Sequence, residues 1–164
     1  MLDFLFPFLF GTFCGSRTML PTTVLCWFAF TGRLHVGGTW FAFLAEPLVV
    51  AILTTAVAAE LLVDKLPITP SRLMWPLLLA RLGAGAFVGA VLAAVIGGRD
   101  LGAHGGALAG AGGALLGALI GYGLRTGLVK RMRLPDWLVA VLEDATTLCG
   151  SYVLMDVLTK VLSH

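Results

Sequence analysis

Apolar residues run along this chain in five long stretches, separated by short segments rich in polar residues, glycine or proline. The stretches cover residues 4–30, 40–63, 73–96, 101–129 and 137–162. Each is close to the roughly 20 residues that a helix needs to cross the hydrocarbon of a bilayer. The pattern therefore predicts an all-α fold: an integral membrane bundle of about five transmembrane helices, in a single domain over residues 1–164.

The first stretch contains residues that interrupt helices. Gly15 and Ser16 precede Arg17, and Thr18 and Pro21 follow it. Glycine and proline weaken a helix interior, and short hydroxyl side chains compete for its backbone hydrogen bonds. We predict a broken first helix, whose exposed N–H groups can hold an anionic group.

Composition narrows the class of protein. Hydrophobic residues make up 59% of the chain and charged residues 12%, which excludes a typical soluble domain. The formal net charge is only +2, and the basic residues gather near the ends of the apolar stretches, so nucleic acid is not an expected partner. The three cysteines lie in apolar stretches without metal-ligand spacing, so we expect neither a metal nor a cofactor.

The distribution of lysine and arginine predicts the orientation. Five crossings place the segments 64–72 and 130–136, which carry five basic residues, on the side of the N-terminus. Basic segments stay in the cytoplasm. The expected topology therefore has a cytoplasmic N-terminus and an outer C-terminus.

Glycines spaced four apart predict how the helices pack. Small residues at this spacing let two helix backbones approach closely, which replaces the hydrophobic driving force that is missing in lipid. The predicted packing glycines of the third and fourth stretches are Gly85, Gly89, Gly102, Gly106, Gly110, Gly113, Gly117 and Gly121. The spacing fits a contact within one chain or across a homodimer.

Ionisable residues inside the apolar stretches are the candidate functional residues, because charges in hydrocarbon need a partner or water. Counting turns places Glu60, Arg81, Arg125, Glu143 and Asp144 at a similar depth, in the half of the bundle that holds the basic segments. This cluster can bind a substrate or an ion. It can equally be a salt-bridge network that locks the bundle.

Three further acidic or basic residues complete the candidate set. Asp64 lies one turn beyond Glu60 on the same helix face, near the membrane interface. Arg17 lies near the middle of its stretch and needs a carboxylate, an anion or water, and Glu46 is a candidate partner from the outer side.

Arg17 and Arg125 each follow a pair of glycines spaced four apart. An odd number of crossings would make the two motifs run in opposite directions. The pattern therefore predicts an inverted repeat, an arrangement that places binding sites near the bilayer midplane.

Four sequence motifs resemble a bacterial family of small multi-pass inner-membrane proteins, the domain-of-unknown-function family four-one-two-six. They are Gly-Ser-Arg-Thr-Met-Leu-Pro at 15–21, Asp-Lys-Leu-Pro at 64–67, Ala-Arg at 80–81 and Leu-Glu-Asp at 142–144. The resemblance covers nearly the whole chain and implies a location in the bacterial inner membrane. It implies no activity.

Two functions from different classes fit these residues. One is a small transporter or channel, proton-coupled through Glu60 or Glu143, whose arginines hold an anionic or zwitterionic small molecule. The other is a non-transporting subunit that binds lipid or assembles with a membrane complex. We see no nucleophile and base placed for catalysis and predict no enzyme.

Overall fold

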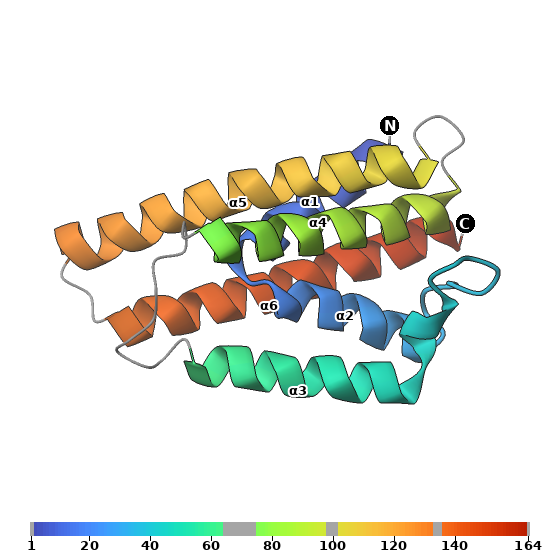
Figure 1. Ribbon diagram of the computed structural model, residues 1–164, viewed down its shortest axis with the longest axis horizontal. Coiled ribbons are helices and arrows are strands. Elements are labelled where there is room, and N and C mark those ends of the chain that lie inside the picture. Colours follow the sequence, from blue (N-terminus) through green and yellow to red (C-terminus); the bar gives the residue numbers. More distant parts are fainter. Residues whose placement is uncertain (1, 64–74, 98–101, 133–135, 164) are drawn as a thin grey trace.

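The computed structural model describes residues 2–63, 75–97, 102–132 and 136–163, and the regular secondary structure of this part of the chain is all helical (Figure 1). The elements are α1 (Leu2–Ser16), α2 (Met19–Phe30), the 3-10 helix η1 (Ala42–Ala45), α3 (Pro47–Val63), α4 (Trp75–Ile96), α5 (Gly102–Met132) and α6 (Asp136–Leu162). The predicted all-α fold is confirmed.

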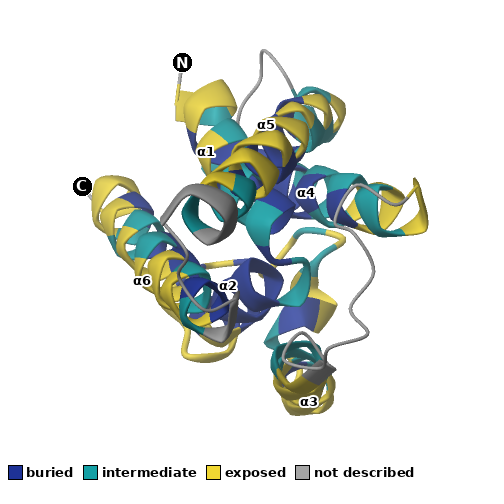
Figure 2. Ribbon diagram, turned by 90° about the vertical axis from the view of Figure 1, so that its left-hand side faces the viewer, coloured by how far each residue is buried: buried dark blue, intermediate teal, exposed yellow. Residues whose placement is uncertain are grey.

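Three helices are long and apolar enough to cross a membrane: Trp75–Ile96, Gly102–Leu128 and Leu138–Leu162. The remaining apolar helices, Leu2–Ser16, Met19–Phe30 and Pro47–Leu62, are shorter. Figure 2 shows exposed residues on the outward faces of α3, α5 and α6, and many of these residues are leucine, isoleucine or valine. Apolar outer faces are what a bilayer requires of the helices that it surrounds.

The first apolar stretch is a hairpin and not a broken rod. Along α1, Ser16 meets Glu143 of α6 and the more N-terminal Phe13 meets Gly150, so the two helices are antiparallel. In contrast, Arg17, just before α2, pairs with Asp144, and Phe28 near the end of α2 meets Tyr152, so α2 runs in the same direction as α6. The chain therefore enters the bundle along α1, turns near Arg17 and returns along α2 to the end where it started (Figure 1).

This hairpin corrects two predictions. Residues 4–30 do not run from one end of the bundle to the other, and the start of α1 lies at the same end of the bundle as the end of α6 (Figure 1), so the two termini are not at opposite ends of the bundle. The two glycine and arginine motifs also run in the same direction, because Phe8 meets Gly113 and Thr12 meets Gly117. An inverted repeat would make α1 and α5 antiparallel, so the predicted inverted repeat of the Arg17 and Arg125 motifs is wrong.

Glycines make α5 the central packing helix. A Cβ atom at Gly85, Gly89, Gly106 or Gly110 would overlap backbone of the facing helix, so α4 and α5 pack backbone to backbone within one chain. Other glycines of α5 pack in the same way against α1, and they are Gly113 and Gly117. Gly102 is an exception, because it has a positive φ of 57° and nothing within 4 Å of its Cβ position; its predicted packing role is wrong.

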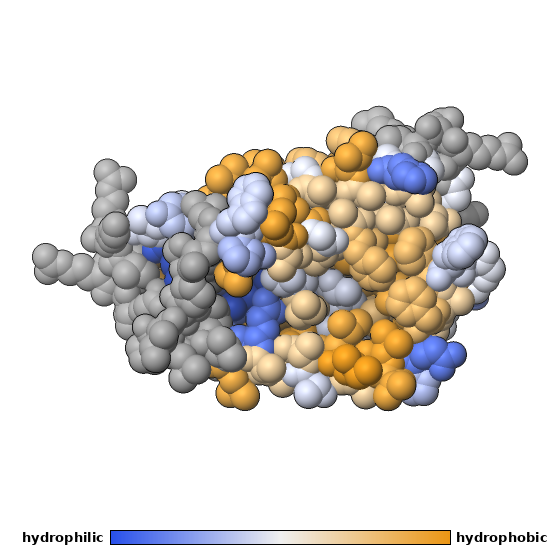
Figure 3. Space-filling model, in the orientation of Figure 1, coloured by the Kyte–Doolittle hydropathy of each residue, from blue (hydrophilic) through white to orange (hydrophobic). Residues whose placement is uncertain are grey.

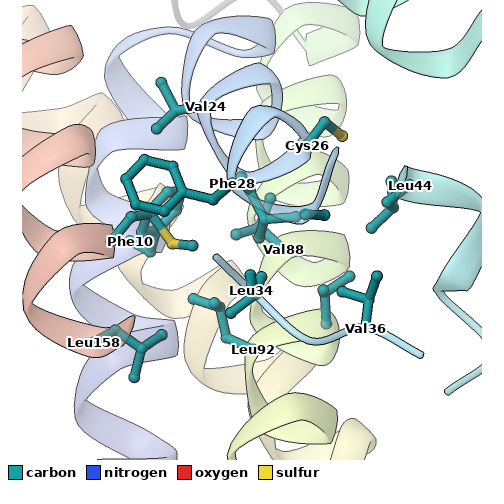
Figure 4. Close-up of a cluster of buried hydrophobic side chains, with 14 of the residues drawn as sticks. Phe10, Val24, Cys26, Phe28, Leu34, Val36, Leu44, Val88, Leu92 and Leu158 are labelled. Atoms are coloured by element: carbon teal, nitrogen blue, oxygen red, sulfur yellow. The ribbon is translucent and has the colours of Figure 1, made fainter. Parts of the chain in front are cut away.

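The hairpin fills the half of the bundle that holds the termini. Figure 4 shows Phe10 of α1, Phe28 of α2, Val88 of α4 and Leu158 of α6 in one buried cluster. The turn near Arg17 marks where this apolar core ends. The polar residues discussed below gather at that level.

Candidate functional site

The turn between α1 and α2 leaves backbone groups that no helix satisfies, and a carboxylate from α3 binds two of them. Thr18 is the N-cap residue of α2, but its side chain makes no capping hydrogen bond. Instead, the N–H groups of Thr18 and Met19 donate to the two carboxylate oxygens of Glu60, at 2.9 and 3.0 Å. A negative charge here also complements the positive end of the helix dipole. The Glu60 carboxylate thus takes the place of the missing capping side chain at the start of a helix distant in sequence.

An arginine from α4 serves the other side of the same turn. Nη1 of Arg81 donates to the carbonyl oxygen of Gly15, in the last turn of α1, at 3.2 Å. Arg81 is only 5% exposed. Cations are favoured at helix C-termini, where carbonyl groups lack partners. The end of α1 is therefore capped by a positive charge and the start of α2 by a negative charge, and each charge is opposite in sign to the helix dipole at that end.

Acidic residues of α6 hold the turn from a third direction. The Nη2 atom of Arg17 lies 2.6 Å from Oδ1 of Asp144 in an ion pair, and the arginine side chain is 3% exposed. One residue earlier, the Ser16 hydroxyl donates to Oε1 of Glu143 at 3.2 Å. The adjacent acids of α6 thus contact adjacent residues of the turn, and α1, α2, α3, α4 and α6 all meet at this point.

A cavity of about 330 Å³ lies next to the turn, between α1, α5 and α6. Ser16 and Glu143 line it at the turn, and Arg125 of α5 lines it with the hydroxyl residues Thr146 and Thr147. The rest of the lining is mainly apolar. Because α5 and α6 continue past the hairpin, the cavity lies in the half of the bundle that the hairpin leaves open. Figure 3 shows another aspect of this half: strongly hydrophilic atoms lie in a hollow between α3 and α4.

Most residues of the predicted cluster do come together. Glu60, Arg81, Glu143 and Asp144 all bind residues 15–19, and Arg125 shares a cavity with Glu143. The predicted break is also present: α1 ends at Ser16, and Pro21 lies in the first turn of α2, where a missing N–H is tolerated. Gly121 lines the cavity. Asp64 lies outside the described residues.

The predicted pairing of Glu46 with Arg17 is wrong. Glu46 is exposed and precedes α3 at the end that holds the termini. It is 14 residues from Glu60, which corresponds to roughly 21 Å along a helix, and Glu60 is the acid that reaches the turn. The mistaken pairing assumed that residues 4–30 pass through the bundle once, as a broken helix with Arg17 near its middle.

Sequence reasoning did not find Thr146 as polar lining of the cavity, and it placed Ser16 at the helix break without predicting its contact with Glu143. It predicted that the N–H groups at the break can hold an anionic group, but not that this group is the carboxylate of Glu60. Hydroxyl residues in apolar helices carry a weak signal, because they also bond to their own helix, as Thr146 does with the carbonyl oxygen of Glu143. Among the residues that the structure describes, no group of three or more His, Cys, Asp or Glu is arranged to hold a metal ion.

Comparison with known proteins gives one match. No curated protein and no solved structure is similar enough to count as a match. Residues 6–159 match a family model that is described as a domain of unknown function, DUF4126. The match spans the hairpin, every helix around the cavity and all the charged residues of the site. The chain therefore belongs to the DUF4126 family.

Proposed function

We propose that the protein is a small membrane transporter that binds an anionic or zwitterionic molecule in the cavity between α1, α5 and α6. The observation that carries this proposal is the joint presence of Arg125 and Glu143 in the lining of one cavity of about 330 Å³. Known ligand sites begin near this size and combine mainly apolar walls with a few placed polar groups. A cation and a carboxylate in one such site suit a molecule that carries both charges.

The sidedness of the bundle supports a site reached from the cytoplasm. In a bacterial inner membrane the more basic end faces inward. By sequence, Lys65 and Arg72 lie between α3 and α4, Lys130 and Arg131 end α5, and Arg133 lies between α5 and α6; Arg33 lies between α2 and η1, Arg99 between α4 and α5, and Lys160 near the end of α6. We infer that the cavity faces the cytoplasm and that both termini lie outside, with α3 as a fourth crossing helix.

The hairpin supplies a candidate gate. The hairpin separates the cavity from the half of the bundle that holds the termini. Non-helical turns of this kind are tolerated inside a membrane where they are buried in protein or line a cavity. Its turn is held by side chains and not by continuous helix. Protonation of Glu60 would weaken its hold on the N–H groups of Thr18 and Met19, which makes this residue the candidate for proton coupling.

A second candidate function also has an observation in its favour. Arg17 pairs directly with Asp144, and Arg81 and Glu60 cap helix ends. Charges used in this way stabilise a fold without any transport. On this alternative the protein is a lipid-binding or assembly subunit, and its glycine-rich core serves only to make a compact scaffold.

Flux into proteoliposomes separates the two functions. We would measure uptake of glutamate, glycine betaine and phosphate by the unmodified protein, by Arg125→Gln and by Lys160→Gln, a control that removes an exposed charge outside the cavity. Transport predicts uptake of at least one compound, which falls at least tenfold in Arg125→Gln and is unchanged in the control. Equal uptake by both folded variants would contradict the proposed site.

A further inference from the structure

A second, apolar cavity lies on the opposite side of the hairpin turn, in the wall of the bundle. It has a volume of about 530 Å³ and is bounded by α2, η1, α3 and α4. In the described residues α3 and α4 make almost no direct contact, so the cavity is a groove between them. Its walls carry side chains such as Ile52, Leu53 and Phe87.

We propose that this groove binds one acyl chain of a bilayer phospholipid. The groove reaches from Thr18, at the turn in the middle of the bundle, to Phe43 of η1, near the end that holds the termini. It therefore runs through the depth at which hydrocarbon surrounds the protein. Trp40, which is 96% exposed and close to η1 in sequence, is a residue type that marks the membrane interface.

The chemistry of the lining excludes water and polar ligands as the stable occupant. The hydroxyl of Thr22 is turned to the carbonyl oxygen of Thr18, at 3.4 Å, and the N–H groups of Thr18 and Met19 are bound by Glu60. The polar groups at the inner end of the groove are thus engaged elsewhere. An empty groove would lose dispersion contacts along its whole length, so hydrocarbon is the occupant that fits.

The way in which α3 is attached to the bundle is a second and independent reason to expect an acyl chain in the groove. Four hydrogen bonds join α3 to α2 or to the turn: Thr23 donates to the carbonyl oxygen of Leu53, Trp27 donates to Thr54, and the N–H groups of Thr18 and Met19 donate to Glu60. A chain in the groove would support α3 from the side of α4. The lipid would then help to hold Glu60 on the turn, whether or not the protein transports anything.

Two glycines allow a matched test. A Cβ atom at Gly83, which lines the groove, has nothing within 4 Å, and the same is true at Gly123, which is exposed on α5 outside the groove. Leucine at either position enters open space, and both changes replace a helical glycine. Only Gly83→Leu fills the groove.

Native mass spectrometry after extraction from vesicles of phosphatidylethanolamine and phosphatidylglycerol would measure the bound lipid. We expect one retained phospholipid in the unmodified protein and in Gly123→Leu, and at least a tenfold smaller lipid-bound fraction in Gly83→Leu. Equal retention in all three proteins, or none in the unmodified protein, would overturn the proposal.

Photocrosslinking of the unmodified protein gives a measurement that does not depend on a variant folding. A phospholipid with a diazirine near the end of one acyl chain should label Ile52 and Phe87 more than Leu116 and Leu119, which are both exposed on α5. Equal labelling of the two sets would overturn the groove as a binding site. Neither measurement involves flux, so this proposal and the transport proposal can fail separately.

Discussion

Replacing Glu60 with glutamine tests whether the hairpin turn depends on a carboxylate. Both oxygens of Glu60 accept backbone N–H groups, at 2.9 and 3.0 Å. Glutamine has nearly the same shape, but its amide offers only one oxygen acceptor, and its NH₂ group would face the second N–H. One donor at the start of α2 therefore loses its partner, and the charge that complements the helix dipole is removed.

The size of the effect follows from these two losses. A buried donor left without an acceptor costs about 1–3 kcal/mol, and the lost charge at a helix N-terminus costs about 0.3–1 kcal/mol more. We expect Glu60→Gln to lower the free energy of unfolding by about 1–4 kcal/mol, the sum of the two ranges. Water that reached the turn from the cavity would bring the value toward the lower limit.

Glu46→Gln is the matched control, because Glu46 lies next to the same helix, is exposed and does not reach the turn. Its effect should stay within about 0.5 kcal/mol, as for other surface substitutions. Far-UV circular dichroism in mixed micelles, titrated with a denaturing detergent, would compare the unfolding midpoints. If both variants unfold at the same midpoint, the carboxylate of Glu60 does not stabilise the start of α2.

Three other outcomes are expected. Gly110→Ala places a methyl group against the carbonyl of the facing helix and should cost about 1–3 kcal/mol, whereas Gly123→Ala enters open space and should be neutral or slightly stabilising in thermal unfolding. Arg17→Gln leaves Asp144 as a largely buried charge and should cost about 3–5 kcal/mol; adding Asp144→Asn should recover part of that loss, and additive effects would disprove the pair. Reporter domains fused to either end of the chain should both indicate the outer side of the membrane, and opposite sides would contradict the hairpin.

Much of this architecture could be predicted because hydropathy and residue type are local signals. The apolar stretches correspond to helices, and Gly15 and Pro21 mark the break between α1 and α2. Counting turns placed Glu60, Arg81 and Glu143 at one level, because each residue of a helix advances by a fixed rise. Depth along a helix is readable from sequence when its ends are known.

The direction in which a helix runs through the bundle cannot be read from the sequence in the same way. A helix that stops at Ser16 and restarts at Met19 has the same hydropathy whether the second part continues or turns back. The contacts that decide, between Phe28 and Tyr152 and between Ser16 and Glu143, join residues far apart in the chain. The predicted topology, the inverted repeat and the role of Glu46 all depended on this one undetermined direction, so they failed together.

The hairpin changes which charges need a functional explanation. A turn in the interior of the bundle exposes N–H and C=O groups that must find partners within the protein. Glu60 and Arg81 meet that need directly, and Arg17 with Asp144 fixes the turn against α6. The case for a substrate therefore does not rest on the charge content as a whole. It rests on the cavity that Arg125 and Glu143 share beyond the turn, where the fold leaves room for another molecule.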